Sequence, residues 1–226
     1  MANKQNAPRR VVWDTCTLIW CLDNAPTPRG TSPDEEKYRT AMREATRSMI
    51  GQATSGQIRI VVPTMAIAET ATPDTSAGPK YATQTLIIEN FLRHPYITRV
   101  ALDSRIAHSA RRLRIEHAGL DLFNEDLIQV ATAIEYNCQE FLTTDGDKHD
   151  SLKTQRRKKK GLLKYDGAFA LADGVGKLQI WTPLERHIER ERLSELEKQQ
   201  ERAAAAEQAK KKTGGSQGKI WPNDDE

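Results

Sequence analysis

The chain has 226 residues, enough for one α/β domain with a sizeable core and an appendage. Its net charge of +3, from 34 Lys and Arg against 31 Asp and Glu, is too small to indicate nucleic-acid binding by itself. No apolar run approaches the roughly 20 residues that a membrane span needs, and no apolar segment of a secretory signal follows the basic N-terminus.

The cysteines favour a reducing compartment. Cys16, Cys21 and Cys138 are odd in number and show no metal-like pairing, and the first two lie in apolar segments. We therefore expect a soluble, cytoplasmic protein that makes no contact with membrane.

Strand-like and helix-like segments alternate along the chain. Short apolar or β-branched runs predict strands over residues 11–13, 58–62, 97–102, 141–143 and 178–181. Helical patterns cover residues 17–22, 33–50, 64–70, 81–93, 104–116, 125–136 and 184–212. This alternation predicts an α/β fold: a doubly wound parallel sheet of four to five strands flanked by helices.

Local signals set several of the expected helix ends. Ser32 followed by Pro33 is a helix start, and Gly51 should stop that helix at about residue 50. Asp103 and Asn124 are expected to be the N-caps of the two helices that follow them.

The C-terminal part changes character. Residues 185–212 read as a projecting charged helix with ion pairs such as Glu195 with Lys198. We therefore divide the chain into a disordered N-terminus (1–10), a main domain (11–184), the charged helix (185–212) and a flexible tail (213–226).

A basic run occupies residues 153–164, with seven basic residues and no acid. It is either a surface that retains a polyanion or a solvated loop, and the residues alone leave both readings open. The candidate polyanion-binding side chains in it are Arg156, Arg157, Lys158, Lys159 and Lys160.

Four acids are placed to meet at one edge of the predicted sheet. Asp14 and Asp145 each follow an apolar strand directly, Glu69 lies in the helix after the second strand, and Asp126 lies in the first turn of a later helix. Each acid alone has an ordinary explanation as a turn, surface or helix-start residue. Clustered carboxylates repel one another unless cations neutralise them, and hard divalent ions prefer oxygen ligands. Together the four acids indicate metal-dependent phosphoryl chemistry.

The segments that carry these acids resemble the four motifs of the PIN-domain family, in order and in spacing. They read VVWDTCTLIWCLD, IVVPTMAIAET, NEDLIQVATAIEYN and EFLTTDGDKH, within a likeness that spans residues 11–183. The resemblance implies a PIN-like nuclease that hydrolyses RNA with Mg²⁺ or Mn²⁺. It assigns Asp14, Glu69, Asp126 and Asp145 as metal ligands and Asp147 as a further, less certain acid.

The same resemblance extends to neighbouring residues and to partners. Thr15 and Thr143 match hydroxyl residues that orient the site, whereas Cys16 stands where the family usually has Ser or Asn. Many small members are VapC-type toxins, so a cognate antitoxin and a homodimer are expected partners beside the RNA substrate.

Two other functions compete. A haloacid-dehalogenase phosphatase needs a second Asp two residues after the first, where this chain has Cys16. A PIN-like module that binds RNA or protein without cutting is the stronger alternative, which the substitution at Cys16 favours and the presence of all four acids opposes.

Overall fold

The core of the protein is a five-stranded parallel sheet. The computed structural model describes residues 7–22, 31–70, 86–146, 161–174 and 176–214. Its strands are β1 (Arg9–Trp13), β2 (Ile58–Pro63), β3 (Ile97–Val100), β4 (Glu140–Leu142) and β5 (Gln179–Trp181). They are ordered β3-β2-β1-β4-β5, and every neighbouring pair is parallel. The predicted doubly wound parallel sheet is therefore confirmed, with the chain reversing its direction of winding between β1 and β4.

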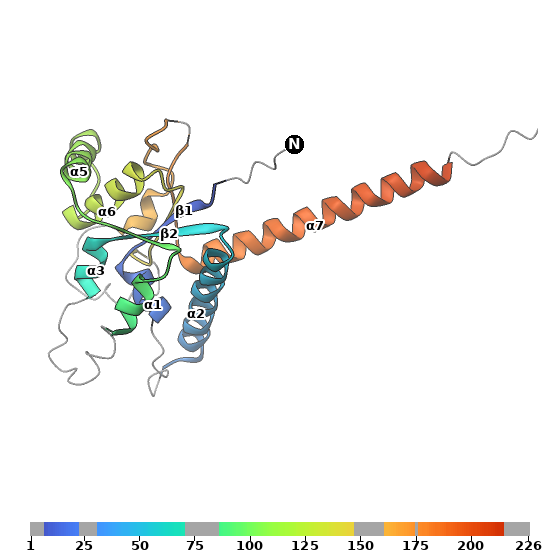
Figure 1. The fold of residues 1–226 in the computed structure, drawn as a ribbon, viewed down its shortest axis with the longest axis horizontal. Helices are drawn as coiled ribbons and strands as arrows, with labels where there is room; N and C mark the ends of the chain where they lie inside the picture. The colour runs from blue at the N-terminus through green and yellow to red at the C-terminus, as the bar shows by residue number, and fades with distance from the viewer. Residues whose placement is uncertain (1–6, 23–30, 71–85, 147–160, 175, 215–226) are drawn as a thin grey trace, which may run out of the picture. The chain divides into compact units, whose positions relative to one another are not determined.

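Helices cover both faces of this sheet. They are α1 (Thr15–Leu22), α2 (Pro33–Thr54), α3 (Thr64–Thr70), α5 (Ser104–Glu116), α6 (Asn124–Glu135), the 3₁₀ helix η2 (Leu162–Tyr165) and α7 (Pro183–Gly214). Residues 86–92 are also helical. In Figure 1, α5 and α6 lie on one side of the sheet and α1 and α2 on the other.

Alternate residues of each strand enter two separate hydrophobic clusters. Val12 and Val61 pack with the residues of α5 and α6, whereas Val11, Trp13 and Val62 pack with those of α1 and α2. A parallel sheet with both faces covered needs apolar side chains at every position, because successive side chains point to opposite faces. The continuous apolar runs of the sequence are the consequence.

Two predicted helix starts are confirmed, and one predicted stop is wrong. The Ser32 hydroxyl accepts a hydrogen bond from the Glu35 N–H at 3.2 Å, and the Asp103 carboxylate accepts one from the Ile106 N–H at 2.9 Å. The helix after Ser32 does not stop at Gly51 but runs to Thr54. Gly56 adopts φ +77° just beyond its end, a left-handed conformation that Gly supplies without strain.

Three more segments differ from expectation. β1 begins at Arg9, inside the N-terminal segment predicted to be disordered, because Arg9 and Arg10 pair with β2. The strand expected to reach residue 102 ends at Val100. The end of the predicted basic insertion is core: Leu162 is fully buried in η2, with α5 and α6.

The chain divides into two compact units, residues 1–186 and 187–226. The start of α7 belongs to the first unit, where Thr182 and Glu185 each accept a hydrogen bond from the other's backbone N–H, at 3.0 and 2.9 Å. The buried Arg186 guanidinium pairs there with the buried Glu140 carboxylate.

The second unit consists of the rest of α7 in the described part of the chain. Its charged side chains pair along the helix, as in the predicted Glu195–Lys198 contact at 2.9 Å and in Glu189–Arg192 at 2.6 Å. Its larger apolar side chains, Ile188, Leu193 and Leu196, are exposed. Within the described residues, every helix is too short or too polar to cross a membrane.

Candidate active site at the carboxyl edge of the sheet

Asp14 follows β1 directly and lies at the point where the winding of the sheet reverses. Its side chain is 4% exposed, and its Oδ1 accepts a hydrogen bond from the Thr17 N–H at 2.8 Å. Burial raises the pKa of Asp14 to about 7, hydrogen bonds from Thr143 and Thr17 lower it, and the charge of Asp145 raises it further. The fold therefore places a carboxylate where its ionised form is costly.

Asp145 stands beside Asp14, after the neighbouring strand β4. The buried Thr143 hydroxyl accepts a hydrogen bond from the Asp145 N–H at 2.9 Å and also bonds to the Asp14 carboxylate. The Leu162 N–H donates to Asp145 Oδ2 at 3.1 Å. The Thr143 hydroxyl thus links the segments that follow β1 and β4, and the hydrogen bond from Leu162 orients the Asp145 carboxylate.

The hydrogen bond between Leu162 in η2 and Asp145 depends on the close approach of two glycines. Gly146 adopts φ +94°, and the backbone of Gly161 lies directly against it. A Cβ atom on Gly161 would come within 2.4 Å of the Gly146 Cα, so only Gly fits. The Gly-Leu-Leu interruption of the basic run was the sequence signal for this contact, and our prediction of a basic insertion missed it.

Glu69 reaches the same edge from α3, the helix that follows β2. Its half-buried carboxylate accepts a hydrogen bond from the Thr15 hydroxyl, and its Oε2 also accepts one from Gln129 Nε2 at 3.4 Å. The predicted orienting residue Thr15 therefore contacts an acid. Gln129 was not predicted, because it lies outside the apolar stripe that identifies its helix.

Asp126 is the third residue of α6. Its Oδ2 accepts a hydrogen bond from the Phe123 N–H at 3.0 Å, so the carboxylate also caps the helix start. The predicted N-cap Asn124 is instead the first helical residue, and its Oδ1 accepts a hydrogen bond from Arg114 at 3.1 Å. The expectation was wrong by one residue: Phe123 occupies the N-cap position, and its N–H donates to the Asp126 carboxylate inside the first turn.

The structure brings Asp14 and Asp145 together and links Glu69 to Thr15 beside them. Within the described residues, no three His, Cys, Asp or Glu side chains lie close enough to hold one metal ion as they stand. Asp147 and the candidate RNA-binding residues 156–160 lie outside the described part of the chain. The complete ligand set therefore stays a prediction.

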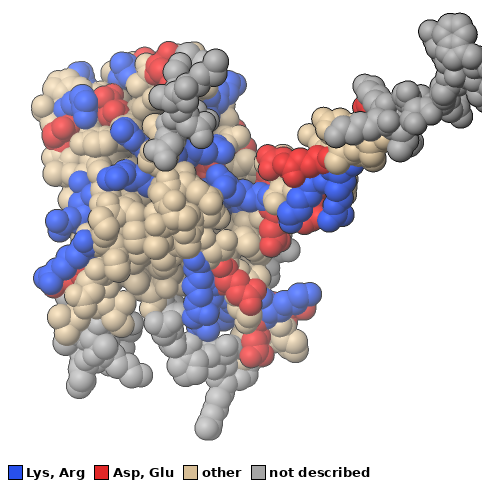
Figure 2. Space-filling view, turned by 45° about the vertical axis from the view of Figure 1, so that its right-hand side comes forward, with Lys and Arg blue, Asp and Glu red and all other residues tan. Residues whose placement is uncertain are grey.

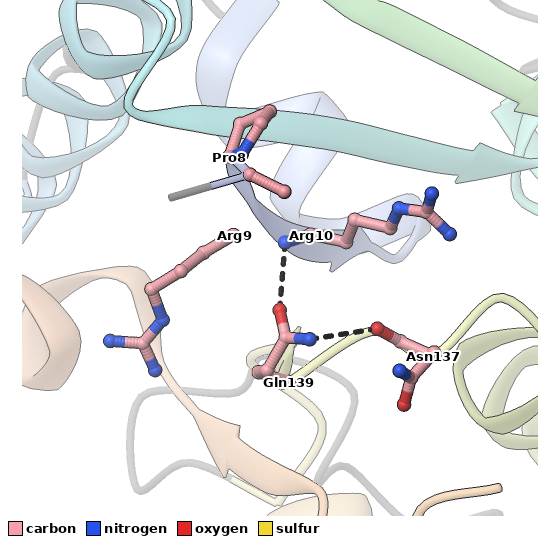
Figure 3. A pocket seen from close by; sticks show the side chains of 6 residues that line it. Pro8, Arg9, Arg10, Asn137 and Gln139 are labelled. Carbon is pink, nitrogen blue, oxygen red and sulfur yellow. Dashed lines mark hydrogen bonds between the residues drawn. The ribbon is translucent and has the colours of Figure 1, made fainter. Parts of the chain in front are cut away.

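A cavity of about 260 Å³ lies at the opposite edge of the sheet, at the amino ends of β1 and β4 (Figure 3). Its lining includes Arg9, Arg10, Asn137 and Gln139. The Arg10 N–H donates to Gln139 Oε1 at 2.9 Å, and the Arg10 guanidinium donates to the Tyr136 carbonyl at 2.8 Å. Because the acids follow the carboxyl ends of the strands, this cavity is separate from the candidate site.

Basic side chains are spread over the face that Figure 2 shows and do not form one continuous patch among the described residues there. Arg114 serves the fold, because its guanidinium donates to the Leu122 carbonyl at 2.7 Å and fastens the loop between α5 and α6. The described residues of this face therefore do not form a basic surface that would attract a polyanion.

No protein-family model matches the chain, and no curated protein matches it. Solved structures to which the chain is similar include the following three. VapBC from Salmonella typhimurium bound to DNA is 14% identical, with a TM-score of 0.46 over 76% of this chain and 98% of that one. VapBC2 from Rickettsia felis, bound to a promoter DNA fragment, is 15% identical, with a TM-score of 0.45 over the same shares. VapC20 from Mycobacterium tuberculosis, a Sarcin-Ricin loop cleaving toxin, is 10% identical, with a TM-score of 0.41 over 61% and 91%.

At these identities and TM-scores, the activities of those proteins do not transfer to this chain. The fold itself is observed directly, in the strand order β3-β2-β1-β4-β5 and in the helices on both faces. The chain has the α/β fold that its sequence predicts, a doubly wound parallel sheet flanked by helices.

Proposed function

We propose that the chain is an endoribonuclease that hydrolyses RNA phosphodiester bonds with Mg²⁺ or Mn²⁺. The observation that carries the proposal is the pair formed by Asp14 and Asp145 at the reversal of the sheet. Burial and the neighbouring charge hold the pKa of Asp14 near 7, a condition that a divalent cation would relieve. A buried acid that served only the fold would be better replaced by a neutral residue.

The donor set fits such an ion chemically. Asp14, Glu69, Asp126 and Asp145 offer only carboxylate oxygens, the ligands that Mg²⁺ and Mn²⁺ prefer, and Asp147 adds a fifth acid in the same motif. When bound, the ion supplies a water of lowered pKa and stabilises negative charge on the phosphate oxygens.

The chain's own residues would orient these acids. Thr17 and Thr143 donate to Asp14, and the Leu162 N–H fixes Asp145. Thr15 holds Glu69 from α1. Donors placed in this way keep each carboxylate in one rotamer, so little reorganisation is needed when the substrate arrives.

The proposal includes partners that the motif resemblance suggests. Residues 156–160 would retain the RNA strand through their positive charge. A VapC-type protein would act in the cytoplasm as a toxin, restrained by an antitoxin and paired with a second copy. Growth arrest on expression of this chain, absent in its Asp14→Asn variant, would support that part of the proposal.

The second candidate is a PIN-like module that binds RNA or protein without cutting. Cys16 favours it, because this position next to Asp14 and Thr15 usually carries a polar side chain in the family that the chain resembles. A thiol is a weaker hydrogen-bond partner than a hydroxyl or an amide.

Cleavage of a mixed RNA pool by the full chain tests the proposal, with Mg²⁺, with Mn²⁺ and with EDTA. We expect metal-dependent cutting that Asp126→Asn abolishes. Glu125→Gln is the matched control, because it removes one charge from the same helix turn and should retain activity. RNA binding without cutting under any of the metals would instead support the inert module.

A further inference from the structure

Gln129 is a buried polar residue in the middle of α6. Its side chain is 4% exposed, in a helix whose buried residues also include Leu127, Val130 and Ala133. A buried amide is costly unless its donor and acceptor atoms both find partners. The contacts of the two ends of this side chain therefore indicate what it does.

The amide nitrogen faces the candidate site. Gln129 Nε2 donates to Glu69 Oε2 at 3.4 Å, the same oxygen that accepts from the Thr15 hydroxyl. Two donors, one from α1 and one from α6, thus meet on one carboxylate oxygen of α3. The opposite amide orientation would set two acceptor oxygens against each other, so the contact itself fixes which end is nitrogen.

The amide oxygen has no such partner. Gln129 Oε1 is buried and makes no hydrogen bond to any of the described residues. A buried acceptor left over on a side chain that contacts Glu69 calls for a donor from outside the chain, and an ordered water is the smallest group that supplies one. Leu at this position would fill the same space without leaving an acceptor unsatisfied.

We infer that Gln129 is a positioning residue of a divalent-cation site: its Nε2 holds the Glu69 carboxylate, and its Oε1 accepts a hydrogen bond from a water of that site. The inference rests on the proposed function for its choice of ligand. It adds a residue that lies three positions after Asp126, so one helix supplies both an acid and the amide that orients a second acid.

Binding of Mn²⁺ alone to the full chain tests the inference without requiring RNA or turnover. Titration followed by the paramagnetic resonance of free Mn²⁺ would compare wild type with Gln129→Leu and with Gln129→Met, which keeps the length of the side chain. We expect both variants to stay folded and to bind Mn²⁺ about tenfold more weakly or worse, as for other residues that orient metal ligands.

Ser109→Ala is the matched control. Ser109 Oγ in α5 is another buried oxygen without a hydrogen bond among the described residues, and it lies in a helix that carries none of the predicted ligands. Its loss should leave Mn²⁺ affinity unchanged, which separates removal of an unsatisfied oxygen from an effect on the site.

The outcomes are distinct from those of the proposed function. Wild-type Mn²⁺ affinity in folded Gln129→Leu or Gln129→Met overturns the inference, even if the protein cuts RNA. Loss of folding in both variants, judged by circular dichroism, also overturns it and makes Gln129 a residue of the core. Weakened Mn²⁺ binding in the variants upholds it, even if no RNA is cut. A wild-type chain that binds no Mn²⁺ overturns the inference and the metal-dependent function together.

Discussion

The backbone of Gly161 lies against that of Gly146, so a Cβ atom on Gly161 would fall 2.4 Å from the Gly146 nitrogen and 2.5 Å from the Asp145 carbonyl carbon. Gly161 has φ −71°, which any residue can adopt, so the restriction is one of space and not of backbone conformation. Atoms of the main chain cannot move aside as a flexible side chain can. Gly161, at the start of η2, therefore lies directly against the turn that carries Asp145.

Gly161→Ala should therefore destabilise the fold and displace the Leu162 N–H from Asp145. We expect a loss of about 1–3 kcal/mol in the free energy of unfolding, as for other overpacked positions. We also expect cleavage to fall more than stability alone would explain. Urea unfolding and the RNA assay measure the two effects.

Gly51→Ala is the control for this substitution. Gly51 lies inside α2, is exposed, and has no atom within 4 Å of the place that a Cβ would take. Ala there should stabilise the protein by roughly 0.5–1 kcal/mol, because Gly is a poor helix former. If the urea midpoint of Gly161→Ala were also unchanged or higher than that of the wild type, the backbone around Gly161 and Gly146 would have to relax without cost.

Asp14→Asn should change how stability depends on pH when EDTA removes divalent ions. The folded pKa of about 7 lies above the unfolded value of about 3.9, so the folded state binds more protons between these values. Stability of the wild type therefore falls as pH rises through that window, by an amount on the order of 4 kcal/mol at most. Asn carries no such charge, so the stability of the variant relative to the wild type should rise between pH 5 and pH 8.

Urea unfolding of both proteins at the two pH values checks this expectation. If the unfolding free energies of the variant and the wild type differed by the same amount at pH 5 and at pH 8, the raised pKa of Asp14 would be contradicted. Ions added at pH 8 should stabilise the wild type and not the variant, since binding to the folded state alone raises its stability.

Cys21 and Cys138 should react slowly with alkylating reagents in the folded protein. Burial raises the pKa of each thiol to about 12. At pH 8 the thiolate fraction is then lower by roughly 10³ than for a free cysteine, and only the thiolate is the nucleophile. Iodoacetamide labelling followed by peptide mass spectrometry would measure the rates, with urea-unfolded protein as the reference. Equal rates in the folded and unfolded protein would show that the two thiols are not buried.

The alternation of strands and helices was predictable from the sequence because local patterns determine it. The β-branched run 58–62 and the cap at Asp103 act within a few residues and needed no knowledge of the rest of the fold. Gly51 misled the prediction because a single glycine costs a helix only about 1 kcal/mol, which the packing of Met49 and Ala53 outweighs.

The parts of the site that the sequence did not reveal depend on distant partners. Asp14 and Asp145 could be placed because each follows a strand of the same sheet. Gln129 could not be, because its significance lies in a contact with Glu69, 60 positions away. Gly161 interrupts the basic run visibly, but the sequence does not show that its neighbour is Gly146, 15 positions away. No periodicity within one segment records such contacts.

Truncation after Leu184 should unfold the protein more readily than truncation after Arg190. The shorter chain loses Glu185, which caps α7, and Arg186, which pairs with the buried Glu140. Removing one partner of a buried ion pair costs about 3–5 kcal/mol. Thermal unfolding of the two truncated chains, beside the full chain, measures the difference. Equal stability of the two would mean that the pair contributes nothing to the fold.

The position of this ion pair, in the first turn of α7, implies that the residues of the helix after Arg186 can be replaced. The first unit includes this helix only up to Arg186, which pairs with the buried Glu140. Beyond that residue the charges of Glu189, Arg192, Glu195 and Lys198 are satisfied along the helix itself. We therefore expect that cleavage of α7 beyond Arg186, or its replacement there by another sequence, leaves the fold of the first unit unchanged.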